Sequence, residues 1–123
     1  MKNLFIAATK KTPEIDFNVN GQLKITGSSY PENTLEFYNP TIEWLEEFLF
    51  ATTEKITINV DLKYINTSST KAILEIITKV GALSKSNVNV AWIYEIEDTD
   101  MHETGEDLES ITNLKFDFIE KAN

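Results

Sequence analysis

Cysteine and arginine are absent from the sequence, and glycine and proline are scarce, with 4 Gly and 3 Pro among 123 residues. The absence of cysteine excludes disulfides, thiolate nucleophiles and cysteine-ligated zinc or iron–sulfur centres. The few glycines form neither a G-x-x-x-x-G-K-S/T loop nor a G-x-G-x-x-G motif, which argues against nucleotide hydrolysis and dinucleotide binding. The remaining composition, 41% hydrophobic and 25% charged, is typical of a globular protein.

Positive charge is scarce as well, because 11 lysines are outnumbered by 20 carboxylates and the formal net charge at pH 7 is −9. The chain has no guanidinium group to grip phosphate or to read guanine edges, and a protein this acidic repels polyanions. We therefore expect neither a nucleic acid nor a membrane surface as a partner.

Long hydrophobic runs are also missing. The apolar run at residues 4–8 is too short for a secretory signal, and no segment approaches the roughly 18 apolar residues of a membrane span. The length of the chain suits one compact domain. We expect a soluble, cytoplasmic protein whose residues 1–123 form a single domain.

Alternation of polar and apolar residues predicts the strands. Residues 14–19 and 22–26 alternate on either side of Asn20-Gly21, a tight-turn dipeptide, and together predict an N-terminal β-hairpin. Residues 56–65 alternate almost without interruption and form the clearest strand pattern in the chain. Further strands are predicted at residues 4–8, 88–94 and 114–119.

Helical spacing of apolar residues predicts three helices. Asn39-Pro40 is a start signal for the first, because Asn caps free amides and Pro is tolerated at the first helical position. The second follows the hydroxyl-rich segment 66–70, and a short third helix is expected near Met101. Two tryptophans within these patterns are expected in the core: Trp44 and Trp92.

The resulting order is β-β-β-α-β-α-β-α-β. The strand–helix–strand unit over residues 56–94 predicts a parallel pair of strands joined by a right-handed crossover. We therefore expect an α/β fold in which a mixed β-sheet packs against about three α-helices.

Candidate catalytic and metal-binding groups are few. His102 is the only histidine, and its acidic, polar surroundings indicate a surface side chain and not a member of a catalytic triad or metal site. These surroundings do not match the calcium loop of an EF-hand, so we expect a solvated acidic face, no metal and no other cofactor. The carboxylates of this stretch are Glu95, Glu97, Asp98, Asp100, Glu103, Glu106, Asp107 and Glu109.

Two other functions are kept as alternatives. A small enzyme would use a carboxylate near a strand end, such as Asp61 or Glu95, as its general base. An acidic scaffold would instead attract a basic protein through its surface charge.

A cluster of hydroxyls, Thr67-Ser68-Ser69-Thr70, lies between the clearest strand and the second helix. One interpretation is an N-cap, in which Asn66 or Thr67 accepts hydrogen bonds from the first free amides of the helix. The other is a phosphorylation site, because the positive end of a helix dipole favours added negative charge without melting the helix. A phosphate there would alter what the surface can bind while leaving the fold intact.

Two segments at a fixed separation carry a family resemblance. They are YINTSSTK at residues 64–71 and SYPENT at residues 29–34. They are accompanied by Glu43-Trp44-Leu45, the strand VAWIY at residues 90–94, and Asp100-Met101 and Gly105-Glu106 in the acidic stretch. With these features nearly the whole chain resembles the SiaC family of bacterial regulatory phosphoproteins.

The resemblance implies a fold similar to the STAS domains of anti-sigma-factor antagonists, and a role in partner switching instead of catalysis. In such modules a serine/threonine kinase related to the histidine-kinase ATPase fold phosphorylates the small protein, and a PPM-type phosphatase reverses the reaction. The unmodified form then binds an effector. For SiaC-type proteins the effector is similar to a diguanylate cyclase, which implies a role in cyclic-di-GMP signalling and biofilm behaviour.

The resemblance also indicates the modified residue. The family's phosphorylated threonine directly follows the Asn of its Asn-Thr-Ser-Ser segment, and the residue in that position here is Thr67. Ser68 and Ser69 remain alternatives because they lie at the same helix start. We expect the adjoining surface to contact partners through Tyr30, Glu32, Asn33, Asn66 and Lys71.

Overall fold

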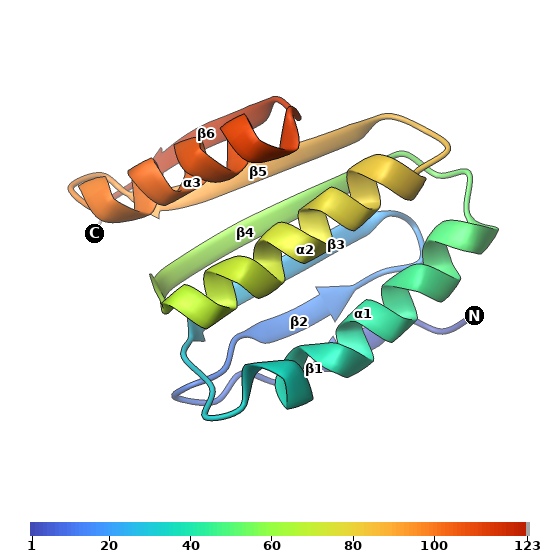
Figure 1. The fold of residues 1–123 in the computed structure, drawn as a ribbon, viewed down its shortest axis with the longest axis horizontal. Helices are drawn as coiled ribbons and strands as arrows, with labels where there is room; N and C mark the ends of the chain where they lie inside the picture. Colours follow the sequence, from blue (N-terminus) through green and yellow to red (C-terminus); the bar gives the residue numbers. More distant parts are fainter. Residues whose placement is uncertain (123) are drawn as a thin grey trace.

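The computed structural model describes residues 1–122 and contains one six-stranded sheet with three helices (Figure 1). The elements are β1 (Leu4–Ile6), β2 (Glu14–Phe17), β3 (Gln22–Ser29), α1 (Thr34–Ala51), β4 (Ile56–Ile65), α2 (Thr67–Leu83), β5 (Val88–Glu95), α3 (Thr99–Thr112) and β6 (Phe116–Lys121). The strands lie across the sheet in chain order, with β1 to β3 antiparallel and β3 to β6 parallel. The expected α/β fold, its mixed sheet and its N-terminal hairpin are confirmed.

All three helices lie side by side over one face of the sheet (Figure 1). Each helix connects two neighbouring parallel strands, and right-handed crossovers that step across a sheet in one direction place their helices on the same face. In β4, alternate side chains from Ile56 to Leu62 are buried beneath the helices, whereas those between them, from Thr57 to Asp61, are half-buried on the open face. The core therefore lies between one layer of strands and one layer of helices.

The first helix begins at Thr34, so the predicted start at Asn39-Pro40 is wrong. Asn33 is the N-cap, and its Oδ1 accepts a hydrogen bond from the backbone N of Glu36 at 3.0 Å. Pro40 lies inside the helix, where its missing N–H leaves the carbonyl of Glu36 without a helical partner. Glu36 and Pro40 are both exposed, so water can solvate the carbonyl of Glu36.

Other boundaries also differ from the predicted ones, and β1 and β2 are shorter than expected, because they end at Ile6 and Phe17. β3 continues to Ser29, because it pairs with β4 as far as Ile65 in spite of a register shift after Gly27. The third helix is not short, since it runs from Thr99 to Thr112, and β6 starts at Phe116 instead of at residue 114. In contrast, the predicted strand at residues 56–65 and the helix after it are confirmed.

The two tryptophans differ in burial. Trp92 is fully buried, as expected, and its Nε1 donates a hydrogen bond to the carbonyl of Met101 at 2.9 Å. Trp44 is only half-buried at the edge of the core, and its Nε1 donates to the carbonyl of Lys2 at 2.8 Å.

No helix within residues 1–122 has both the length and the apolar composition needed to cross a bilayer.

Candidate functional site

The helix α2 starts directly after β4, with Asn66 as the one residue between them. Asn66 Oδ1 accepts a hydrogen bond from the backbone N of Ser69 at 2.9 Å, and its carbonyl accepts one from the Thr70 hydroxyl at 3.0 Å. Its own backbone N donates to the carbonyl of Ser29 at 3.0 Å. The predicted N-cap is thus present, with Asn66 as the capping residue, and it ties the start of α2 to the end of β3.

Ser69 belongs to a buried hydroxyl network. Its side chain is fully buried and accepts a hydrogen bond from Ser29 Oγ at 2.8 Å, while Ser29 Oγ lies 2.6 Å from the hydroxyl of Tyr38. Burial raises the pKa of Tyr38 to about 12, although its hydrogen bonds with the two serines act in the opposite direction. A phosphoryl group on Ser69 would break this network, so Ser69 is the least accessible of the three candidate hydroxyls.

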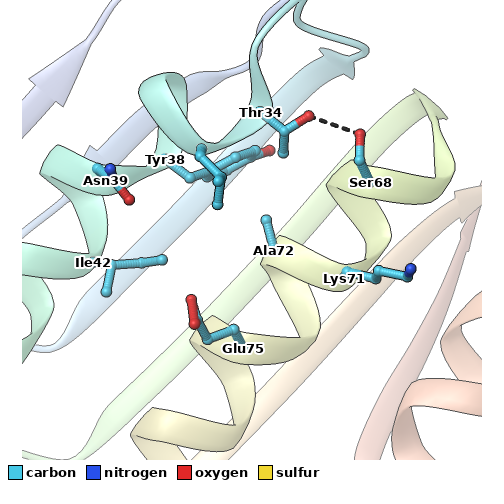
Figure 2. Close-up of a pocket in the computed structure, with 9 residues that line it drawn as sticks. Thr34, Tyr38, Asn39, Ile42, Ser68, Lys71, Ala72 and Glu75 are labelled. Carbon is cyan, nitrogen blue, oxygen red and sulfur yellow. Dashed lines mark hydrogen bonds between the residues drawn. The ribbon is translucent and has the colours of Figure 1, made fainter.

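Ser68 faces α1. Its Oγ lies 2.7 Å from Oγ1 of Thr34, the first residue of α1, and also donates to Asn66 Oδ1 at 3.3 Å. Figure 2 shows this pair at the edge of a hollow between α1 and α2, which has a volume of about 260 Å³ and is lined by apolar side chains such as Ile42 and Ala72. The Ser68 hydroxyl is exposed but already engaged in linking the two helices.

Thr67 lies on the other side of α2. It is exposed at the first helical position, and its side chain forms no hydrogen bond within residues 1–122. It lines a separate hollow of about 360 Å³ between α2 and α3, together with Thr104 and Asp107 of α3. Thr67 therefore offers an unengaged hydroxyl on a surface different from that of Ser68.

The segment between β3 and α1 brings other expected contact residues to the same edge of the sheet, because the parallel strands β3 and β4 end together there. The ring of Tyr30 packs edge-on against Tyr64 with centroids 5.4 Å apart. Glu32 accepts an ion-pair contact from Lys11 at 3.1 Å, and Asn33 caps α1. The structure thus gathers these residues at the edge where α2 begins.

Lys71 lies one helical turn after Thr67. It is exposed and lines both the hollow between α1 and α2 and the hollow between α2 and α3. Among residues 1–122 it forms no ion pair, whereas Lys79 on the same helix pairs with Glu46 of α1 at 3.2 Å. Lys71 is therefore free to meet a charged group on a partner.

His102 is less exposed than the sequence suggests. Its ring stacks on Tyr94 with centroids 4.7 Å apart and meets the ring of Phe118 edge-on at 5.2 Å, so the residue is half-buried. Its Nδ1 lies 3.8 Å from a carboxylate oxygen of Glu106. These contacts assign His102 to packing between α3 and the sheet.

Asp61 and Glu95, the carboxylates considered as general bases for an enzyme, lie in strands of the sheet and not at the start of α2. Asp61 forms an ion pair with Lys121 at 2.5 Å on the open face of the sheet, the face that the helices leave uncovered. Glu95 is half-buried at the end of β5. Within residues 1–122, no three His, Asp or Glu side chains are close enough together to hold a metal ion.

Three residues of this region have roles that the sequence reasoning missed. They are Ser29 and Tyr38 of the buried network, and Thr34, which bonds to Ser68. The sequence does contain a signal for the helix start at Thr34, because Asn33 and Glu36 stand three residues apart, as an N-cap residue and the acidic residue of the first turn do. The pairing of Ser29 with Tyr38 depends on tertiary packing and has no comparable local signal.

Comparison with known proteins gives a consistent result. The model of the SiaC family of regulatory phosphoproteins matches residues 6–121. An uncharacterized protein of Pseudomonas aeruginosa strain UCBPP-PA14 is 30% identical over 119 residues, which cover 94% of each protein. Among solved structures, one chain of the diguanylate cyclase SiaD in complex with its activator SiaC from Pseudomonas aeruginosa matches with a TM-score of 0.88 and 29% identity, over 96% of this chain and 99% of that one. SiaC of Pseudomonas aeruginosa matches with a TM-score of 0.81 and 30% identity over the full length of both chains.

Proposed function

The chain belongs to the SiaC family of regulatory phosphoproteins, and we propose that it is a non-enzymatic partner-switching protein whose switch is the hydroxyl of Thr67. The unmodified form binds and regulates an effector of the diguanylate cyclase type, and phosphorylation of Thr67 ends that complex. The observation that carries the proposal is the exposed, unengaged hydroxyl at the first position of α2.

The modification is a reversible group transfer. A serine/threonine kinase of the histidine-kinase ATPase type transfers the γ-phosphoryl group of ATP to Thr67 Oγ1, which loses its proton as ADP leaves. A PPM-type phosphatase then hydrolyses the ester with water and releases inorganic phosphate, which restores the hydroxyl. The chain itself is the substrate of both enzymes, acts as one regulatory domain over residues 1–123 and works in the cytoplasm.

The position of Thr67 allows a phosphate without loss of the fold. The positive end of the α2 dipole favours negative charge at the first helical position. The hydrogen bonds that anchor α2 run through Asn66 and Ser69, and neither residue depends on the Thr67 hydroxyl. A phosphate at this position therefore changes the surface and leaves the anchor of the helix in place.

The partner surface adjoins the switch. It comprises Thr67 and residues of the two segments that meet where α2 begins, which are Tyr30, Glu32, Asn33, Asn66 and Lys71. Relatives support an effector of this kind, because SiaC of Pseudomonas aeruginosa is described as the activator of the diguanylate cyclase SiaD. A partner that packs on this surface would have to desolvate an added phosphate and meet its charge, which weakens binding.

Phosphopeptide mapping after incubation with the cognate kinase and ATP tests the site. We expect the phosphate on the Thr67 peptide, complete loss of modification in Thr67→Ala, and unchanged modification in the matched variant Ser68→Ala. The fold is expected to survive both exposed substitutions. Undiminished phosphorylation of Thr67→Ala would remove Thr67 from this role.

A further inference from the structure

We infer that Lys71 is the counter-ion of the phosphate on Thr67, so that phosphorylation also withdraws this lysine from the partner surface. This role rests on the proposed modification of Thr67 and names the side chain through which it acts. Its basis is the juxtaposition of an unengaged hydroxyl and an unpaired lysine on one side of α2.

Helix geometry places the two residues together. Thr67 and Lys71 are four positions apart in α2, and residues at that spacing are neighbours on a helix surface, with Cβ atoms about 6 Å apart. Both line the hollow between α2 and α3. Figure 2 shows the Lys71 side chain extending from α2 away from α1. The long lysine side chain can therefore reach a phosphate on Thr67 without any change in the backbone.

Lys71 is also the available cation of this helix. Lys79, the other lysine of α2, already pairs with Glu46 of α1 at 3.2 Å, whereas Lys71 has no such partner among residues 1–122. A charge-assisted contact between an ammonium and a phosphate is stronger than a neutral hydrogen bond. Lys71 is thus the lysine of α2 that is free to pair with a phosphate at position 67.

Other charged side chains near Thr67 and Lys71 also act on a phosphate at position 67. Asp107 of α3 lines the hollow that Thr67 and Lys71 share, and it repels an added phosphate. Glu75 adjoins Lys71 in the hollow between α1 and α2, where the lining side chains of α1 are uncharged. Asp100 of α3 and Lys63 of β4 line the next hollow, beyond Thr104. Lys71 therefore contributes the main attraction within the shared hollow, and Asp107 the main repulsion.

The second pKa of the phosphate reports this pairing directly. Phosphothreonine is built into position 67 of the full chain by genetic encoding, and its ³¹P resonance is followed across the second pKa, which is about 6 in an unpaired phosphate. An adjacent cation lowers that pKa, so we expect Lys71→Gln to raise it by about 0.2 to 0.4 of a unit. Lys71→Arg keeps the charge and should leave the pKa low. Asp107→Asn should lower the pKa further.

The matched control is Lys79→Gln, which removes a charge two turns further along α2 and should leave the phosphate pKa unchanged. An unchanged pKa in Lys71→Gln, or an equal rise in Lys79→Gln, would overturn the role of Lys71. Because the phosphate is installed during synthesis, the titration does not depend on any kinase. A kinase that fails to modify Thr67 would defeat the proposed function and still leave the result for Lys71 readable.

Discussion

Tyr38 carries an ionisable hydroxyl inside the core, where it is hydrogen-bonded to Ser29. Burial raises its pKa to about 12 from the ordinary value of 10.0. Between these pH values the unfolded chain has released a proton that the folded chain still holds, so the free energy of unfolding falls as the pH rises. The maximum slope is about 1.4 kcal/mol per pH unit. Below about pH 10 both states hold the proton and the stabilising contribution is complete.

We predict that Tyr38→Phe removes this part of the alkaline destabilisation. Urea unfolding of both proteins at a series of pH values measures it, and the stability advantage of the wild type should shrink above about pH 10. Tyr64→Phe is the matched control, because Tyr64 is 54% exposed and should keep the wild-type pH dependence. Parallel stability curves for the wild type and Tyr38→Phe would show that the hydroxyl does not titrate differently in the core.

The hydroxyls at the start of α2 show which features of single residues can be predicted from the sequence. The position of the hydroxyl cluster between a strand and a helix, together with the family resemblance, selects the segment that contains Thr67. The order of exposure within that segment does not follow from it. Successive residues point about 100° apart around a helix, so the rotation of α2 on the sheet decides which hydroxyl enters the core. That rotation places Ser69 inside and leaves Thr67 free.

Among the elements, the start of α1 offers a direct test, because the sequence and the structure assign it to different asparagines. We predict that Asn33→Ala lowers the free energy of unfolding by about 1 kcal/mol, within a range of about 0.5 to 2, because it removes the side chain that caps the Glu36 amide. Asn39→Ala should change it by less than about 0.5 kcal/mol, because Asn39 is exposed inside the helix. Urea denaturation measures both, and a larger cost for Asn39→Ala would restore the later helix start.

Elements with an uninterrupted pattern were predictable, and those with competing signals were not. The strand at residues 56–65 alternates throughout and agrees with the structure at both ends. For α1, the competing signal is Pro40, which normally marks the first turn of a helix because it leaves one carbonyl unpaired in a helix interior. Here that carbonyl belongs to the exposed Glu36, where water can solvate it, so Pro40 is tolerated inside the helix. The full length of α3 does not follow from the sequence, because its buried face consists of only Met101, Gly105 and Leu108 among many carboxylates, which gives a weak helical pattern.

At the scale of the whole molecule, the single layer of helices decides where the switch lies. Because all the crossovers fall on one face, the starts of α1 and α2 meet at one edge of the sheet, where Thr34 and Ser68 join them. The chain already carries a net charge of −9, and a phosphate adds about −1.5 to −2. Interactions between exposed charges are screened beyond about 8 Å at physiological salt. The added charge must therefore act locally, on a partner that touches Thr67.

A phosphate on Thr67 should prevent the effector from binding, and calorimetric titration of the cognate diguanylate cyclase tests this most directly. We predict that phosphothreonine at position 67 weakens binding at least about tenfold, or about 1.4 kcal/mol, and that Thr67→Asp weakens it in the same direction. The neutral variant Thr67→Asn, close in shape to Thr67→Asp, should bind within about threefold of the unmodified chain, a difference of less than about 1 kcal/mol. Equal affinity of the phosphorylated and unmodified proteins would contradict the account.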